Sequence, residues 1–253
     1  MAWQERDSRS IGAVVVGVDD SPWALNAVRW AASEAVNRDV VLRLVHVIPP
    51  AKPEQDARRC DTTLLDAADA ARQARETVRV ETACIAGSPE KVLDEESCHA
   101  EMVCIGARPL RLCAGRLIGA TAAHLAAHSR CPVAIIRSAE DGSPRTQGVV
   151  SVVLTDDDDN DEVVGLAMRE GRLRKATVRQ IDRRLNSWIR RFPDVHVETV
   201  AAGTASMFPS DESDHVGLAV VGPSDAAGIA SLDVPNCHPI LGYPDCSVLL
   251  VRH

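Results

Sequence analysis

The chain has 253 residues, a formal net charge of −8 and 45% hydrophobic residues, of which few are aromatic. This length exceeds one average domain and favours two. The negative charge excludes a general electrostatic affinity for nucleic acid or anionic lipid. The sequence has no run of about 18 apolar residues that could span a bilayer. We therefore expect neither a nucleic-acid partner nor a membrane association.

The N-terminus and the cysteines indicate a cytoplasmic protein. Residues 1–10 are polar and lack the apolar segment of a secretory signal. Eight cysteines are scattered without a C-x-x-C pair, so we expect reduced thiols. The adjacent Cys98 and His99 make a poor zinc site, and His124 and His128, spaced for a metal on a helix, lack a third ligand. We expect no metal site.

The first half alternates apolar strands with amphipathic helices. A buried strand at 11–18 is followed by Asp19, and Ser21 and Pro22 are typical of a helix cap and a first helical residue. Further strands are predicted at 40–48, 78–85, 102–105 and 132–137, with helices at 54–77, 89–100 and 119–129 and a loop at 106–118.

This alternation predicts an α/β fold with a doubly wound, Rossmann-like parallel sheet and helices on both faces. In such sheets ligands bind at the carboxyl ends of the strands, near the point where the strand order reverses. Asp19, Val47 and Gly106 fall at three of those ends.

The segments VVVGVDDSPWA, LRLVHVI and VCIG, followed after a loop by IGATAAHLAAHSRCPVAIIR, resemble the universal stress protein family. The resemblance covers the whole first half in order. It implies that Asp19 and the backbone of Val47 hold an adenosine, and that a glycine-containing loop from Gly106 to Gly119 wraps the phosphates of ATP or AMP.

Two positions depart from the phosphate-binding pattern of that family, G-x-x-G-x9-G-[S/T]. Pro109 replaces the middle glycine, which removes a backbone N–H, and Ala120 replaces the hydroxyl residue. Thr121 is the next residue and carries a hydroxyl. One step along a helix rotates the side-chain direction by about 100°, so this hydroxyl points away from the place of the missing one. We expect the loss of two contacts to weaken phosphate binding by orders of magnitude.

Arginines in the same loop could compensate in part, or could be only a solvated loop face; they are Arg108, Arg111 and Arg116. The complete set expected at the nucleotide site is Asp19, Val47, Gly106, Arg108, Gly119, Ala120 and Thr121.

The second half repeats the first in shortened form. The segment 78–82 (VRVET) is echoed at 195–199 (VHVET), and strands predicted at 150–154, 218–221 and 247–252 match the first, fourth and fifth strands. We therefore predict a first domain at 1–137, a linker at 138–148 and a degenerate second domain of the same type at 149–253.

The shortening falls before the third strand of the repeat. From Asp19 to Gly106 is 87 positions, whereas from Asp156 to Gly222 is 66. Helices are predicted near 162–173 and 183–192, and residues 176–181 are either a short second strand or helix.

The repeat lacks the features of a nucleotide site. Asp225 stands in place of the middle glycine, and Val234 and Pro235 in place of Gly-Ser. The acidic run 156–159 adds negative charge at the same edge and reads as a solvated turn rather than an ion site. We expect nucleotide in the first half only.

The last strands of the two halves, 133–137 and 248–252, are short and apolar, and we expect them to pair with each other at the sheet edges. The resemblance implies association through this strand, which a tandem chain can satisfy internally. A homodimer and an unknown protein partner are further possibilities.

No residues suit a catalytic mechanism, because no serine has the context of a nucleophile elbow, and we predict that the protein is not an enzyme. The resemblance implies a role in stress or growth arrest. The alternative is an interaction scaffold that binds no nucleotide. A nucleotidyl-transfer or flavoprotein-like function lacks its signature motifs.

Overall fold

The computed structural model describes residues 12–49, 53–108, 118–139, 142–144, 147–153, 160–181, 191–200, 215–223 and 246–252. Its strands are β1 (Ala13–Val18), β2 (Leu42–Ile48), β3 (Val80–Ala86), β4 (Ala100–Ala107), β5 (Val133–Arg137), β6 (Val149–Val153), β7 (Val178–Ile181), β8 (Val197–Val200), β9 (Val216–Val221) and β10 (Ser247–Leu250). Its helices are α1 (Pro22–Arg38), α2 (Pro53–Ala74), α3 (Pro89–Ser97), α4 (Ala120–His128) and α5 (Asn160–Arg174).

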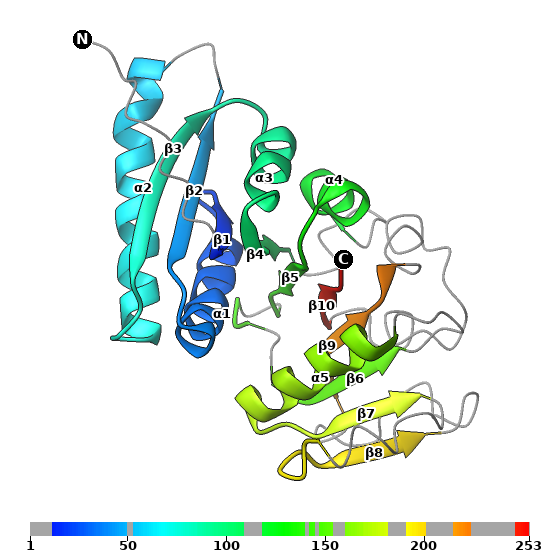
Figure 1. Ribbon diagram of the computed structural model, residues 1–253. Coiled ribbons are helices and arrows are strands. Elements are labelled where there is room, and N and C mark those ends of the chain that lie inside the picture. The colour runs from blue at the N-terminus through cyan, green and yellow to red at the C-terminus, as the bar shows by residue number, and fades with distance from the viewer. Residues whose placement is uncertain are drawn as a thin grey trace.

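All ten of these strands form one sheet, in the order β3-β2-β1-β4-β5-β10-β9-β6-β7-β8 (Figure 1). The first five follow the order 3-2-1-4-5 of a doubly wound fold, and the second five repeat that order in the opposite direction across the sheet. Within each half the pairs are parallel. The mirrored order supports duplication of one unit.

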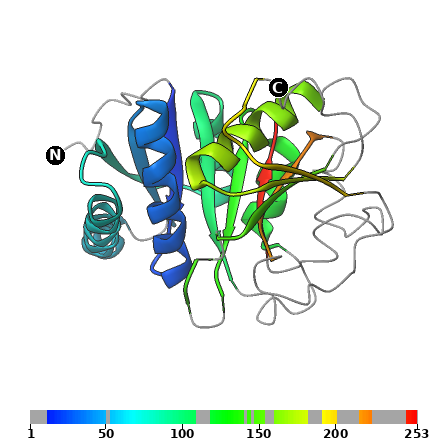
Figure 2. The ribbon, with the colours of Figure 1, turned by 90° about the horizontal axis from the view of Figure 1, so that it is seen from below.

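The two halves join through β5 and β10, which pair antiparallel with Ile135 opposite Val248. The backbone N–H of Arg137 also donates to Ser247 Oγ over 3.1 Å. This confirms the predicted pairing of the last strands. Because each strand twists relative to its neighbour, β7 and β8 are turned strongly relative to β2 and β3 (Figures 1 and 2).

Helices cover both faces of the first half. Helices α1 and α2 share an apolar core with α5, into which alternate strand residues such as Val14, Val16 and Leu44 project. The intervening residues, such as Val15 and Val103, face α3 and α4 on the other side. Strands buried on both faces explain the continuous apolar runs in the sequence. None of the helices in the described ranges is long and apolar enough to cross a membrane.

Residues 178–181 pair in parallel with β6 on one side and β8 on the other. The prediction of a short second strand in the repeat is therefore confirmed, and its helical alternative is wrong. The segment 182–190, most of the predicted helix 183–192, lies outside the described residues.

One expectation about the cysteines is wrong. Cys60 of α2 and Cys84 of β3 form a disulfide with their Cα atoms 6.3 Å apart, whereas we expected reduced thiols. The packing of α2 against β3 brings together two residues that are 24 positions apart, which no spacing rule along the chain reveals. The other cysteines in the described ranges, Cys98, Cys104, Cys131 and Cys246, are free thiols.

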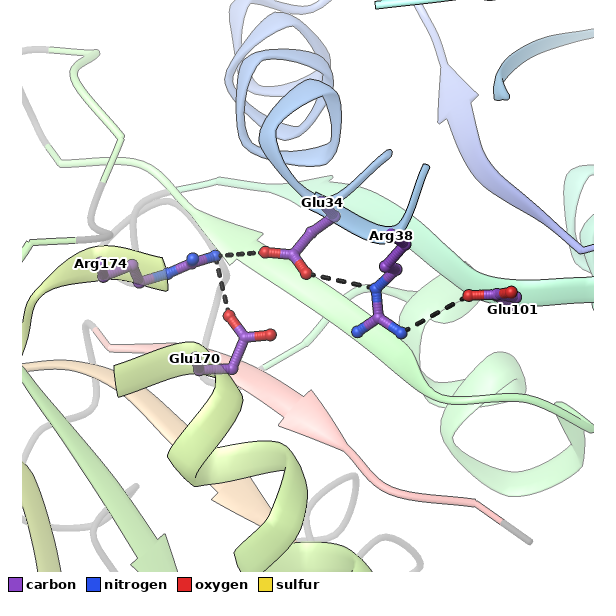
Figure 3. Close-up of polar contacts among 5 residues, drawn as sticks. All are labelled: Glu34, Arg38, Glu101, Glu170 and Arg174. Carbon is purple, nitrogen blue, oxygen red and sulfur yellow. Dashed lines mark hydrogen bonds and ion pairs between the residues drawn. The ribbon is translucent and has the colours of Figure 1, made fainter. Parts of the chain in front are cut away.

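A buried ionic cluster also links the halves (Figure 3). Arg174 of α5 lies 2.9 Å from Glu34 of α1 and 3.0 Å from Glu170 of its own helix. Glu34 also pairs with Arg38, which reaches Glu101 of β4. Both Glu34 and Glu170 are only 1% exposed, so these carboxylates are held at the contact between the two halves.

Candidate functional site

A cavity of about 470 Å³ opens at the carboxyl ends of β1, β2 and β4. The strand order reverses between β1 and β4, since β2 lies on one side of β1 and β4 lies on the other side of β1. The cavity lies at this point of reversal. All seven residues that the sequence predicts for a nucleotide site line its wall: Asp19, Val47, Gly106, Arg108, Gly119, Ala120 and Thr121.

Asp19 is exposed and stands between the end of β1 and the start of α1. Its Oδ1 accepts hydrogen bonds from the backbone N–H of Ser21, over 3.0 Å, and from the hydroxyl of Ser21. Ser21 in turn caps α1, because its Oγ accepts from the N–H of Ala24. The carboxylate is thus held at the mouth of the cavity by the same turn that starts the helix.

The glycines Gly106 and Gly119 serve different purposes. A Cβ at Gly106 would lie 2.3 Å from the carbonyl oxygen of Trp23, so only glycine lets β4 approach the first turn of α1. Gly119 is the N-cap of α4, and no described residue lies within 4 Å of a Cβ at this position. The N–H groups in the first turn of α4 could hold an anion, because the first turn of a helix has no hydrogen-bond partners for them within the helix.

Val47, in β2, is half-buried in the cavity wall beside His46. The imidazole Nδ1 of His46 lies 2.7 Å from the carbonyl oxygen of Val18, which ties the ends of β1 and β2 together. His46 is not among the seven residues that the sequence predicts for this site. Its place in the wall follows from the register of β2 against β1, which pairs it with Val18.

Thr121 and Arg108 lie on the α4 side of the cavity. The hydroxyl of Thr121 donates to Glu90 Oε1 over 3.5 Å, a weak bond that directs it toward α3. The carbonyl oxygen of Arg108 accepts from Arg137 Nη1 over 3.1 Å, which anchors the end of β4 to β5. The remaining loop residues of the prediction, Pro109, Arg111 and Arg116, lie outside the described residues.

Asp20, next to Asp19, faces α2 instead of the cavity. Its carboxylate accepts hydrogen bonds from Thr63 and Arg59. The bond from Thr63 is the main cause that lowers the pKa of Asp20; burial opposes it and Arg59 adds to it. The sequence gives no signal for this contact, because α2 reaches Asp20 only through tertiary packing.

Most of the corresponding region of the second half lies outside the described residues. Gly222 follows β9 as predicted, but Asp225, Val234, Pro235 and the acidic run 156–159 lie outside the described residues. The absence of a nucleotide site in this half stays a prediction.

Metal ligands do not gather within the ranges that the structure describes. No group of three or more His, Cys, Asp or Glu residues is arranged to hold an ion there. His128 Nδ1 lies 2.9 Å from the carbonyl oxygen of His124, and the two rings stack with their centroids 4.3 Å apart.

Comparisons with known proteins show the family and the fold of this chain. The model of the universal stress protein family matches residues 11–137. Two universal stress proteins of Mycobacterium tuberculosis are similar along their length. Rv2624c is 35% identical over 98% of both chains, and Rv3134c is 34% identical over 97% of this chain and 98% of its own. The crystal structure of a universal stress protein from Archaeoglobus fulgidus covers 97% of each chain with a TM-score of 0.65; at 12% identity it shows the fold alone. The chain belongs to the universal stress protein family.

Proposed function

We propose that this universal stress protein binds an adenine nucleotide, ATP or AMP, in the cavity of its first half and performs no catalysis. In this proposal the bound nucleotide changes how the protein contacts a partner during stress or growth arrest. The family assignment supports a cytoplasmic location. We retain residues 1–137, 138–148 and 149–253 as first domain, linker and second domain in this proposal.

One observation carries the proposal: the seven residues predicted from the sequence, which lie far apart along the chain, line a single cavity at the strand-order reversal. Asp19 offers a carboxylate that can accept hydrogen bonds from ribose hydroxyls. The backbone at Val47 can pair with the base, and the open N-terminus of α4 at Gly119 can hold phosphate. A volume of about 470 Å³ suits a mononucleotide.

The phosphate end of this site is incomplete. Ala120 brings no hydroxyl to the first turn of α4, and the hydroxyl of the neighbouring Thr121 is directed to Glu90. The carboxylate of Glu90 also adds negative charge on that side. We therefore propose that AMP and ATP bind with similar, weak affinity, since the added phosphates gain few contacts.

Calorimetric titration of the purified chain with ATP and AMP tests the proposal. We expect dissociation constants in the range of about 100 μM or weaker, given two lost contacts. Ala120→Ser should tighten ATP binding by about tenfold through one recovered donor. Asp19→Ala should abolish binding of both nucleotides, whereas Asp69→Ala, an exposed acid on α2 paired with Arg72, should not.

The alternative is a scaffold that binds no nucleotide. The observation that favours it is the same loss of a hydroxyl at Ala120. A chain that binds neither ATP nor AMP, with or without Ala120→Ser, would establish the scaffold and exclude our proposal. A homodimer would have to use a surface other than the last strands, because β5 and β10 already pair with each other within the chain.

A further inference from the structure

A second cavity, of about 660 Å³, lies between the two halves of the chain. The first half contributes residues of α1 and Arg75, just after α2. The second half contributes the start of β6, the end of α5 and the turn before β7. None of its lining residues belongs to the nucleotide cavity.

Among the residues that the structure describes, the charged side chains that line this cavity are all cationic. They are Arg29, Arg75, Arg174 and Lys175. Arg174 is neutralised by its buried partners in Figure 3. The other three pair with no carboxylate among the described residues. This is unusual in a chain with a net charge of −8, where acidic neighbours outnumber basic ones.

Arg29 is held in place by a buried amide. The Nδ2 of Asn26 donates to Ser138 Oγ over 2.8 Å and to the carbonyl oxygen of Gly142 over 2.7 Å. These bonds fix the orientation of the Asn26 side chain, which is 2% exposed, and its Oδ1 accepts from Arg29 Nη1 over 3.2 Å. A cation oriented in advance loses less entropy when a ligand binds.

Polar and apolar groups complete the wall. The hydroxyls of Ser33 and Thr177 make no hydrogen bond to any described residue and are available to a ligand. Trp30 is 6% exposed, and the guanidinium of Arg174 stacks over its ring at 4.7 Å from the centroid. The wall thus combines cations, neutral donors and one aromatic surface, as ligand sites between domains do.

We propose that this cavity binds a small molecule carrying two or more neighbouring negative charges of the phosphate class, such as a diphosphate group. The planar guanidinium forks of Arg29 and Arg75 match phosphate oxygens, and Lys175 adds a point charge from the second half. Because cations from both halves contact the ligand, its binding stabilises their mutual contact. The site is separate from the nucleotide site, and neither proposal depends on the other.

Calorimetric titration of the full chain with inorganic pyrophosphate at low ionic strength tests this proposal. We expect saturable binding that Arg29→Ala and Arg75→Ala each weaken by about tenfold or more, the worth of one charge-assisted hydrogen bond. Both arginines are exposed, so these variants keep the fold. The control is Arg130→Ala, an exposed cation beyond α4, which should bind as the natural chain does.

Tryptophan fluorescence locates the binding. Trp30 lines this cavity and Trp23 lines the nucleotide cavity. Pyrophosphate should change the emission of the natural chain and of Trp23→Phe but not that of Trp30→Phe. Absence of saturable binding, or an equal loss in Arg130→Ala, would overturn the proposal. So would a fluorescence response that vanishes in Trp23→Phe and persists in Trp30→Phe.

Discussion

At the level of single residues, Gly106 and Gly119 belong to one motif, but glycine is needed at the two positions for different reasons. Gly106 is where β4 touches the backbone of α1 at Trp23, while Gly119 borders open space. A motif read as phosphate-binding thus contains one glycine required by packing and one that leaves room for a ligand. The distinction appears only when the two elements are placed in space.

Gly106→Ala should lower the free energy of unfolding by about 2 kcal/mol, since overpacking of this kind costs about 1–3 kcal/mol. The added methyl would press against the Trp23 carbonyl oxygen and shift α1 away from β4. Urea unfolding followed by circular dichroism measures the loss.

Gly119→Ala is the matched control for this substitution. It changes the same residue type in the same cavity wall, but its methyl contacts no described residue, so only a capping loss of up to about 1 kcal/mol is expected. Equal losses in the two variants would mean that the contact with Trp23 is not what requires glycine at 106.

The strand pattern placed Asp19, Val47 and Gly106 at strand ends, and the resemblance to the family's phosphate-binding loop added Arg108, Gly119, Ala120 and Thr121 to the predicted wall residues. The prediction missed His46 as a wall residue, and it missed the contacts of Asp20 with Thr63 and of Thr121 with Glu90. Each of these depends on strand register or on helix packing. Neither is encoded by local periodicity.

At the level of elements, the strands of the repeat were predictable to within a few residues because they are apolar runs between turns. The short strand β7 was ambiguous, since four residues carry too little periodicity to separate strand from helix. Its pairing with β6 and β8 shows that it is a strand. For so short a segment, the contacts with neighbouring strands determine the secondary structure, and the local sequence pattern does not.

Helix α2 is tied to β3 by the disulfide between Cys60 and Cys84. Closing a loop of 24 positions restricts the unfolded chain, which stabilises the fold by about 3 kcal/mol in the chain-entropy model. Reduction with dithiothreitol should therefore lower the free energy of unfolding by about that amount. Denaturant unfolding with and without the reductant measures the difference.

The controls for this prediction are two cysteine variants. Cys60→Ser combined with Cys84→Ser should be as unstable as the reduced chain and should not respond to dithiothreitol. Cys98→Ser, which removes an exposed free thiol, should respond as the natural chain does. A natural chain whose unfolding curve is unchanged by the reductant would contradict the disulfide.

At the level of the whole molecule, duplication places the same strand order on both sides of the β5–β10 contact. The pairing was predictable, because two apolar edge strands in one chain satisfy each other. The ionic cluster on α1 and α5 could not be predicted, because in the sequence Glu34 and Glu170 resemble ordinary charged residues of a helix surface. They are buried only because the two halves fold against a shared core.

Glu170 makes this contact between the halves sensitive to pH. Burial, followed by the nearby Glu34 carboxylate, raises the pKa of Glu170 to about 8 from an ordinary value of 4.5, although Arg174 and Arg38 oppose the shift. The folded chain thus holds a proton there that the unfolded chain releases at lower pH. The resulting stabilisation is complete below pH 4.5 and is lost as the pH rises through about 8.

We therefore expect the free energy of unfolding to fall between pH 6 and pH 9 by on the order of a few kcal/mol, at about 1.4 kcal/mol per unit of pKa shift. Glu170→Gln mimics the protonated acid and should flatten this dependence, so its advantage in stability over the natural chain should be clearly larger at pH 9 than at pH 6. Glu162→Gln, on the exposed side of the same helix, should keep the natural slope. Urea unfolding of the three chains at both pH values decides the matter: a natural chain as stable at pH 9 as at pH 6 would show that Glu170 is already ionised, with Arg174 and Arg38 outweighing its burial.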